Sequence, residues 1–380
     1  MLVLNKKLLT SESVGPGHPD KICDQISDAI LDKCLAFDKD SKVACEVFAS
    51  NRLIVIGGEI TTEAYIDVVK TAWEVLKPLG YNESDFTIIS NINSQSPDIN
   101  QAVVKNQEIL AGDQGIVYGF ACDETDDYMP LPITIANQII KELCNKVKNN
   151  NLFKYDMKSQ VTIDYSEPNN LKIFSCLVSI QHDKKVTNSQ IIEFVKPVIM
   201  NVAKEYCLNN DFDIIINPSG RFTIGGPIGD TGLTGRKIIV DTYGGYAKHG
   251  GGAFSGKDPS KVDRSGSYFA RYIAKNLVAA GISKKCEIQL AFGIGLSEPI
   301  AIHIDTFGTS KYSNEQILRV VNAIFDFKVN NFIQNLKLFN PIYQSTAVLG
   351  HFGNNQSNAP WEQLDKVQEI KNLINKESLC

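Results

Sequence analysis

The chain has 380 residues, of which 43% are hydrophobic and 21% charged, and this composition excludes a disordered, collagen-like or coiled-coil protein. Its 38 Lys and Arg against 43 Asp and Glu give a net charge of −5, which argues against nucleic acid or a membrane surface as a partner. The length favours several smaller hydrophobic cores over one large core.

A helix, two strands and a second helix follow one another in the same order in each third of the chain. Because short turns join the two strands, they should pair antiparallel, with the helices on one face. A repeat of more than 100 residues indicates triplication of a whole domain, so we predict an α+β fold of three similar subdomains with pseudo-threefold symmetry. The predicted elements lie at 20–37, 43–48, 53–60 and 62–76, then at 133–148, 160–165, 172–181 and 189–207, and finally at 264–280, 286–295, 300–307 and 314–336.

The repeat places the subdomains at residues 1–101, 110–227 and 228–380. The uncovered faces of three such sheets need cover, from each other or from a second subunit, so we expect a homo-oligomer. Nothing in the sequence fixes the number of subunits.

The start of the chain and its cysteines predict a cytoplasmic location. The first residues lack the apolar run of a signal peptide, and no apolar stretch approaches the roughly 20 residues of a membrane span. The nine cysteines are odd in number and form no C-x-x-C pair, so we expect neither a disulfide framework nor a zinc site. We expect them to be reduced and mostly buried.

Residues 91–112 are polar, weakly periodic and longer than most connections. They could form a mobile lid over an active site or a solvated linker. Long loops in compact proteins are often functional, which favours the lid.

Residues 220–256 hold 12 of the 27 glycines of the chain. Glycine lets backbone N–H groups approach a ligand closely, and interleaved basic side chains supply the counter-charge that phosphate requires. The segment therefore predicts a polyphosphate site. The basic residues in it and directly after it are Arg221, Arg236, Lys237, Lys248, His249 and Lys257.

The sequence GGGAFSGKD, residues 250–258, comes close to a phosphate-binding P-loop. A P-loop needs Ser or Thr after its Lys, and Asp258 stands there instead. The segment follows a predicted strand at 237–243 and leads into a predicted helix. Phosphate binding remains the preferred interpretation, because a merely tight turn would not explain Lys257 and Lys261.

The sequence SVGPGHPDK, residues 13–21, predicts a helix whose first residue is Pro19 and whose cap is His18. The positive end of a helix attracts phosphate, and His18 and Lys21 would add donors. His18 could equally be an ordinary cap. Asp20 could either complement the helix dipole or hold Mg²⁺ on the same phosphates.

Three carboxylates stand in positions that call for a partner. Asp230 lies between glycines ahead of the adjacent Arg236 and Lys237, which favours ligand binding over a solvated surface. Glu46 and Glu59 lie in apolar strands, where each must have a cationic partner or point outward. The residues alone thus predict an enzyme that binds a nucleotide polyphosphate with Mg²⁺, and they leave the second substrate open.

Together the motifs resemble the methionine adenosyltransferase family, also called S-adenosylmethionine synthetases. The resemblance covers nearly the whole chain in order. It implies three similar α+β domains in a homodimer or a dimer of dimers. The matching segments are GHPDK at 17–21, GGEIT at 57–61, QSPDINQ at 95–101, GDQG at 112–115, KSQVT at 158–162, residues 216–245, residues 250–265 and GHFG at 350–353.

The resemblance also implies the reaction. The sulfur of L-methionine attacks C5′ of ATP and expels triphosphate, which is then hydrolysed to pyrophosphate and phosphate. Positioning and charge stabilisation would carry the rate, with no protein nucleophile. Active sites at the dimer interface, Mg²⁺ and K⁺ would complete the enzyme.

Residue roles follow from the resemblance position by position. His18 would lie at the leaving oxygen and Asp113 at the developing sulfonium. The implied sites are catalysis by His18, Lys158, Lys257 and Asp113; ATP at His18, Asp156, Lys158, Arg221, Phe222, Asp230, Arg236, Lys237, Ala253 and Lys257; methionine at Glu59, Gln95, Asp230 and Lys261; Mg²⁺ at Asp20 and Asp263; and K⁺ at Glu46.

Two segments depart from the bacterial pattern, Gly15-Pro16 ahead of the GHPDK motif and residues 354–362 after GHFG. Neither removes an implied ligand. Two other functions stay open. A kinase or ATPase would transfer the γ-phosphoryl group, and an ATP-sensing module would bind ATP without turnover.

Overall fold

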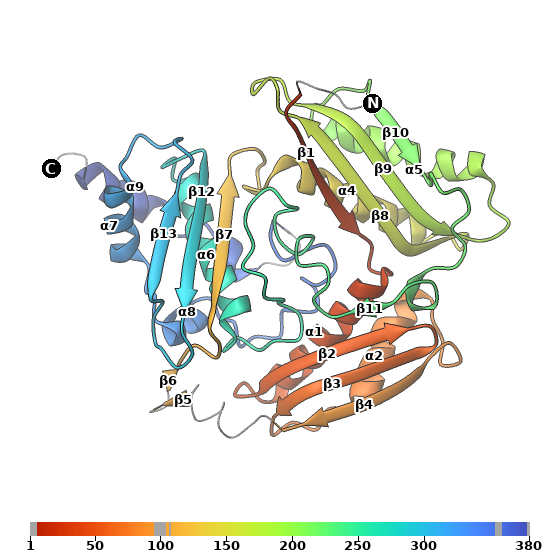
Figure 1. The fold of residues 1–380 in the computed structure, drawn as a ribbon, viewed down its shortest axis with the longest axis horizontal. Coiled ribbons are helices and arrows are strands. Elements are labelled where there is room, and N and C mark those ends of the chain that lie inside the picture. Colours follow the sequence, from red (N-terminus) through yellow and green to blue (C-terminus); the bar gives the residue numbers. More distant parts are fainter. Residues whose placement is uncertain (1–5, 95–103, 106–107, 354–358, 378–380) are drawn as a thin grey trace.

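The computed structural model describes residues 6–94, 104–105, 108–353 and 359–377. Its strands form two sheets of four strands, one of three and a two-stranded ribbon. Figure 1 shows the three larger sheets arranged around a centre that holds α1 (Pro19–Phe37) and the connections after β11 (Gly232–Leu233). The predicted α+β architecture of three subdomains is confirmed.

The strand order defines a first, a central and a third sheet. Pairing is antiparallel except between β3 and β4 and between β9 and β10. The first sheet contains β11, β2 (Lys42–Ser50), β3 (Leu53–Thr61) and β4 (Thr87–Asn93); the central sheet β1 (Leu8–Val14), β8 (Phe153–Asp164), β9 (Lys172–His182) and β10 (Asp213–Ile216); the third sheet β13 (Ala301–Asp305), β12 (Lys285–Phe292) and β7 (Gly115–Cys122); and the ribbon β5 (Val104–Lys105) and β6 (Glu108–Ile109).

Each third of the chain contributes one strand to the sheet of another third. β1 precedes α1 but pairs with β8 in the central sheet, and β7 precedes the central helices but pairs with β12 in the third sheet. β11 returns from the last third to pair with β2 in the first sheet. The three subdomains therefore exchange strands in a cycle.

Helices cover one face of each sheet. α1 and α2 lie against the first sheet, α4 and α5 against the central sheet, and α6 against the third sheet. None of the helices among the described residues is long and apolar enough to cross a membrane. The bounds are α2 (Val68–Leu76), α4 (Leu131–Val147), α5 (Asn188–Glu205), α6 (Val262–Ala279), α7 (Asn314–Ile324), α8 (Val329–Asn335) and α9 (Val367–Glu377), with short 3₁₀ turns at Lys77–Leu79, Gly226–Ile228 and Pro360–Glu362.

Two hydrophobic cores hold the described residues together. One is continuous through the first and third subdomains, where side chains of α1 and α6 meet those of β2 and β7. The other belongs to the central subdomain and is formed by α4, α5, β8 and β9. The centre of the molecule is thus built from elements far apart in sequence.

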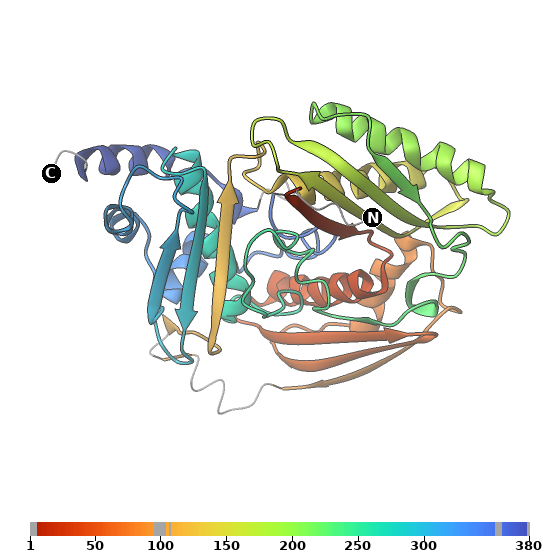
Figure 2. The same ribbon diagram turned by 45° about the horizontal axis from the view of Figure 1, so that its top comes forward.

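Among the described elements, the helices lie on one face of each sheet and leave the opposite face without a helix. Figure 2 shows α1 above the first sheet, whose lower face stays uncovered. Apolar side chains are exposed on these faces, including Phe48 and Ile89 on the first sheet, Ile215 on the central sheet and Ile116 on the third. Such surfaces on a globular protein commonly mark interaction sites.

Three predicted elements differ from the structure. The segment 237–243, predicted as a strand, forms successive turns, because Asp241 N–H bonds back to the carbonyl of Lys237. The helix predicted from residue 62 begins at Val68, where Asp67 caps it. The helix predicted at 314–336 is two helices, which a break at residues 325–328 separates.

Eight cysteines lie among the described residues, and all eight are free. Six of them are buried, so the prediction of mostly buried thiols is confirmed for this part of the chain. Burial raises the pKa of several of these thiols, with that of Cys45 at about 12, which keeps them protonated and unreactive.

Candidate active site

The N-terminus of α1 is built as the sequence predicts. Pro19 is its first residue, and the cap His18 accepts the N–H of Asp20 at Nδ1, 3.2 Å away. Burial, together with the charges of Lys237 and Lys158, lowers the pKa of His18 to about 3. The imidazole is therefore neutral, and because Nδ1 accepts, its proton lies on Nε2.

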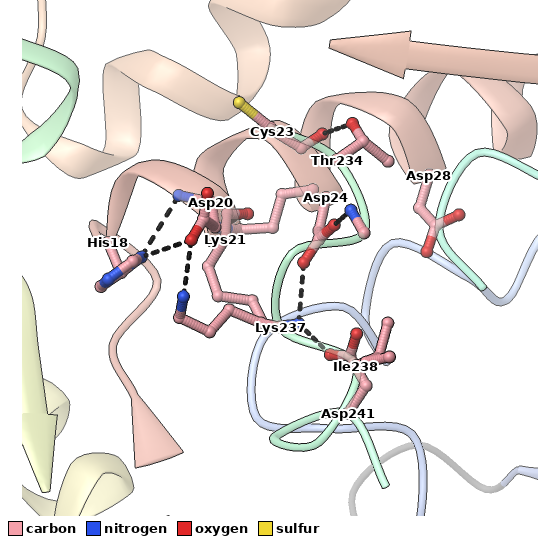
Figure 3. Close-up of polar contacts among 12 residues, drawn as sticks. His18, Asp20, Lys21, Cys23, Asp24, Asp28, Thr234, Lys237, Ile238 and Asp241 are labelled. Carbon is pink, nitrogen blue, oxygen red and sulfur yellow. Dashed lines mark hydrogen bonds and ion pairs between the residues drawn. The ribbon is translucent and has the colours of Figure 1, made fainter. Parts of the chain in front are cut away.

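Asp20 joins the helix end to the glycine-rich segment (Figure 3). Its Oδ2 lies 2.6 Å from Nζ of Lys237, and its Oδ1 accepts the N–H of Leu233 at 3.0 Å and lies 3.6 Å from Nε of Arg236. Burial raises the pKa of Asp20, but the bond from Lys237 and the Leu233 amide outweigh burial and lower it. Asp20 is therefore a firmly ionised carboxylate with only 2% of its side chain exposed.

These residues form what we call the α1 cluster: His18, Asp20, Lys158, Arg236 and Lys237. Lys158 projects from the uncovered face of β8, and its positive charge acts on His18. Three cations, a neutral N–H donor and the positive end of a helix point to an anionic ligand. Arg236 is half exposed and free to reach such a ligand.

Lys21 does not take the role predicted for it. Its side chain is completely buried, and Nζ is held by Asp241 and by Asp24, whose Oδ2 lies 3.1 Å away. Burial lowers the pKa of Lys21, but the two carboxylates raise it further and keep the ammonium charged. A buried and doubly paired lysine cannot donate to a bound phosphate.

A cavity of about 260 Å³ opens beside the α1 cluster. Asp156 lies in its wall, and its Oδ2 accepts the N–H of Gly226 at 2.7 Å. Burial raises the pKa of Asp156 to about 6, although the Gly226 amide and Lys158 oppose the shift. Phe222 is anchored at the rim through His182, which accepts the Phe222 N–H at 3.1 Å. The wall combines apolar side chains with the polar groups of Asp156 and Gln181, which suits a nucleoside.

Asp230 and Arg221 flank this cavity from the loops of the glycine-rich segment. Both are exposed, and Asp230 Oδ1 accepts the N–H of Thr231 at 2.9 Å. Arg221 Nε donates to the hydroxyl of Thr223 at 3.3 Å. Neither side chain contacts a member of the α1 cluster, so each stands available for a ligand at the edge of the cavity.

A second group lies at the N-terminus of α6, and we call it the α6 cluster: Lys257, Asp258, Lys261 and Asp263. Lys257 Nζ lies 2.7 Å from Oδ2 of Asp263, and Lys261 pairs with Asp258. Asp258 is completely buried and also accepts the N–H of Val43 at 2.7 Å, so this residue, which excludes a P-loop, serves instead to fix the loop to β2.

The glycine-rich loop packs tightly around Asp263. A Cβ added to Gly252 would lie 2.1 Å from Cγ of Asp263, and one added to Gly256 would lie 1.9 Å from the carbonyl oxygen of Cys45. Gly256 also has a φ of 80°, which disfavours any side chain. Glycine is therefore needed here for the close approach that the sequence analysis expected.

The remaining predicted residues border the α6 cluster. Glu59 is exposed on β3, opposite Ala44, which bridges to Lys257. Asp113 is exposed, and the neighbouring Gly112 donates to the carbonyl of Ser260 at 3.0 Å.

Three further predicted site residues remain. Ala253 lies against Gly235, and Glu46 is exposed on β2. Of the two alternatives left open for Glu46 and Glu59, a cationic partner or an outward orientation, the structure shows the outward orientation. Gln95 lies outside the described residues.

The predicted site thus consists of two groups. In the described part of the chain, no hydrogen bond or ion pair joins a side chain of the α1 cluster to one of the α6 cluster. The segments that carry the two clusters also approach each other closely, because a Cβ on Gly235 would lie 2.5 Å from that of Ala253. The sequence analysis overlooked the buried partners Asp24 and Asp241. The spacing of Lys21 and Asp24, three residues apart on a helix, was the available signal.

The carboxylates of this site suit Mg²⁺ only when a bound ligand supplies further oxygen atoms. No group of three acidic, His or Cys side chains that could hold a metal by itself occurs among the residues with described positions. Asp20 and Asp263 each offer one ionisable carboxylate beside a lysine. This is the arrangement in which Mg²⁺ takes one or two protein carboxylates and completes its shell with phosphate oxygens and water.

Comparison with known proteins identifies the family. Residues 6–101, 108–222 and 224–363 match the N-terminal, central and C-terminal domains of S-adenosylmethionine synthetase. S-adenosylmethionine synthases of Mycoplasmopsis pulmonis and Clostridium tetani are 57% and 46% identical, over 98% and 97% of this chain and 100% of each relative. That of Mycoplasma mycoides is 53% identical over 97% of both chains. The chain therefore belongs to the S-adenosylmethionine synthetase family, whose members are methionine adenosyltransferases.

Proposed function

We propose that this chain carries out the reaction of its family. The sulfur of L-methionine attacks C5′ of ATP, S-adenosylmethionine forms, and the expelled triphosphate is hydrolysed to pyrophosphate and phosphate. The observation that carries this proposal is the α1 cluster, where a neutral imidazole donor and three cations meet at a helix N-terminus. No kinase-type P-loop accompanies it, because Asp258 is buried and paired with Lys261.

His18 and the cations act on the leaving group. The Nε2–H of His18 donates to the oxygen that departs from C5′, and because this imidazole is neutral it does so without repelling the nearby cations. Lys158, Arg236 and Lys237, joined by Lys257, hold the triphosphate as its charge grows. Preorganised donors of this kind stabilise developing charge without reorganisation during the reaction.

The cavity beside Asp156 receives the nucleoside. Asp156 and Asp230 offer oxygens to ribose hydroxyls or to the methionine ammonium, while Phe222 and Arg221 border the base, with Ala253 nearby. Methionine is held by Glu59, Gln95, Asp230 and Lys261. Asp113, exposed beside the loop of the α6 cluster, faces the sulfonium that forms.

We propose Mg²⁺ at Asp20 and Asp263 and K⁺ at Glu46. Bound Mg²⁺ would neutralise charge on the triphosphate. For this, Lys237 and Lys257 must shift their present bonds from the two carboxylates to phosphate oxygens. Glu46 supplies an exposed carboxylate oxygen that, within the described residues, accepts no bond from a cationic side chain.

We further propose a homodimer or homotetramer with active sites at the subunit interface. The separation of the α1 and α6 clusters supports this arrangement, since groups from two subunits could face one ligand. So do the uncovered sheet faces with Phe48, Ile89 and Ile116 exposed. Glu46 and Glu59 also lie on the uncovered face of the first sheet.

Three further predictions stay proposals. The subdomain boundaries at 1–101, 110–227 and 228–380 lie near those of the three matching family domains. The active-site loop proposed at 91–112, of which 95–103 and 106–107 lie outside the described residues, gains support from Gly112, which bonds to Ser260 next to Lys261. The free cysteines of the described part support a reducing, cytoplasmic location.

The deciding experiment incubates the protein with ATP, Mg²⁺, K⁺ and L-methionine and separates the products by chromatography. We expect S-adenosylmethionine, pyrophosphate and phosphate in equal amounts. ADP as the main product would support a kinase or ATPase instead. Saturable ATP binding with no methionine-dependent turnover would support an ATP sensor.

A further inference from the structure

We infer that Lys21, Asp24 and Asp241 form a buried positioning network that holds the segment 235–241, and with it Arg236 and Lys237, against the N-terminus of α1. The inference rests on the proposed function, in which these two cations bind the triphosphate. None of the three network residues can touch a substrate, because their side chains are at most 1% exposed. Their effect must pass through the residues that they hold.

Asp24 fixes the start of the segment. Its Oδ1 accepts the N–H of Gly235 at 2.8 Å, and Gly235 is the residue directly before Arg236. Its Oδ2 lies 3.1 Å from Nζ of Lys21, one helical turn away on α1. Asp24 therefore ties the backbone of the segment to the same helix that carries His18 and Asp20.

Asp241 fixes the end of the segment. Its Oδ1 bonds to the ammonium of Lys21, and its backbone N–H donates to the carbonyl of Lys237 at 2.8 Å (Figure 3). Lys237 itself reaches Asp20, as described above. The five residues between Gly235 and Asp241 are thus held at both ends and in the middle, all by α1.

The GHFG motif closes the network from the other side. His351 donates its backbone N–H to the carbonyl of Asp241 at 2.9 Å, and its Nδ1 meets the hydroxyl of Tyr268 at 2.7 Å. Its Nε2 lies 3.8 Å from Oδ1 of Asp241 and finds no hydrogen-bond partner among the residues that the structure describes. Burial, with the charges of Arg264 and Lys21, lowers the pKa of His351, so its ring is neutral. His351 therefore does not compete with Lys21 as a positively charged partner of Asp241. The motif had no role in the proposed chemistry, and here it seals Asp241 from water.

Burying these charges is costly, and well-packed apolar residues would often stabilise a protein as well. A buried charge network does what apolar packing cannot, because it accepts only one alignment of donors and acceptors. That property suits a segment whose two cations must meet the phosphates at fixed positions. A misplacement of about 1 Å can cost about 10²-fold in rate.

The test compares the wild type with Lys21→Met/Asp241→Asn, which removes one buried charge of each sign and so leaves the net charge of the network unchanged, while Asp24 keeps the Gly235 amide as its partner. The control is Arg271→Met/Glu362→Gln, which removes another buried ion pair, with partners 2.9 Å apart, in the last third of the chain. Each full-length variant is assayed for S-adenosylmethionine formation and for hydrolysis of added inorganic triphosphate. Hydrogen exchange of the Gly235 amide and thermal unfolding are followed in parallel.

For Lys21→Met/Asp241→Asn we expect kcat to fall about 10- to 100-fold and the KM for triphosphate to rise several-fold, with the KM for methionine unchanged. The Gly235 amide should exchange faster. The control variant should lose thermal stability but keep kcat and the KM for triphosphate within about twofold of the wild-type values. Lys21→Arg, which retains the charge, should recover most of the lost kcat. Where the double variant does not fold, Asp24→Asn is measured in its place, with the same shifts expected.

Unchanged triphosphate KM and Gly235 exchange in a folded variant would overturn the inference, and so would equal losses in the control. Lys237→Ala in the same assays separates this result from a failure of the proposed function. If Lys237→Ala leaves triphosphate hydrolysis intact, the assignment of that cation is wrong, whereas the exchange of Gly235 still decides whether the network holds the segment.

Discussion

The N-termini of α1 and α6 each carry an Asp–Lys pair, but the pair at α1 is more deeply buried. Each has an aspartate as its second residue, Asp20 or Asp263, paired with a lysine from the glycine-rich segment. Asp20 is 2% exposed and also bonded by a backbone amide, whereas Asp263 is 14% exposed. α1 has a side-chain cap and α6 has none. The N-terminus of α1 is therefore fixed before substrate binds, whereas the N-terminus of α6 can rearrange around the substrate.

The largest effect should follow from Lys237→Ala. The change removes a charge-assisted contact to the proposed triphosphate and also takes from the buried carboxylate of Asp20 its nearest cation, at 2.6 Å, so that Arg236 at 3.6 Å and the Leu233 amide remain. We expect a loss of roughly 3 kcal/mol or more, about 10²-fold in kcat/KM, measured by steady-state kinetics. A loss smaller than that of Lys257→Ala would contradict the idea that the more deeply buried α1 end contributes more to kcat/KM.

Lys257→Ala should cost less, because its partner Asp263 is partly exposed to solvent. Loss of one charge-assisted contact to triphosphate should lower kcat/KM by roughly 1.5 to 3 kcal/mol, with little change in the free energy of unfolding. Lys77→Ala is the matched control, since its pair with Glu83 lies on the surface at 2.9 Å and should matter by less than about 1 kcal/mol. A rate within a few-fold of wild type would remove Lys257 from the site.

Two glycines test how rigid each helix end is. A Cβ on Gly232 would lie 2.3 Å from the backbone of Pro19, whereas one on Gly252 would meet only the side chain of Asp263. Gly232→Ala should therefore lower the free energy of unfolding by about 1 to 3 kcal/mol. Gly252→Ala should stay folded and lose activity as Asp263 is displaced. Equal free energies of unfolding for the two variants, measured by denaturant titration, would show that the two helix ends tolerate an added side chain equally well.

The smallest effect concerns magnesium. Asp20→Asn and Asp263→Asn should each raise the Mg²⁺ concentration for half-maximal activity by about tenfold, because a carboxylate ligand becomes an amide. The shift should be larger for the buried Asp20, where water cannot easily replace the lost oxygen. If Asp20→Asn left the Mg²⁺ dependence of the activity unchanged, the role of Asp20 would be to complement the helix dipole.

Two long helices were predicted well from the sequence. The segments 20–37 and 264–280 correspond to Pro19–Phe37 and Val262–Ala279, because apolar residues recur at helical spacing on one buried face. The strands β1, β7 and β11 were overlooked, since their partners lie far away along the chain. The segment 237–243 looked like a strand, but tertiary contacts of Asp241 decided its conformation.

The local geometry at the candidate site could be predicted from the sequence, but the layout of the site could not. His18 as a cap and the close packing of the glycine-rich segment follow from local chemistry. The division into α1 and α6 clusters does not, because it depends on how distant segments pack. Lys21 shows the limit most clearly, since a lysine beside a phosphate motif and a lysine inside an ion network have the same sequence signature.

The cyclic exchange of strands bears on how the chain can fold during synthesis. β1 leaves the ribosome first yet must wait for β8, and the first sheet stays incomplete until residues 232–233 have emerged. No third of the chain can reach its final form while its neighbours are missing. Separately expressed thirds should therefore remain incompletely folded, and mixing all three should be needed to recover native structure.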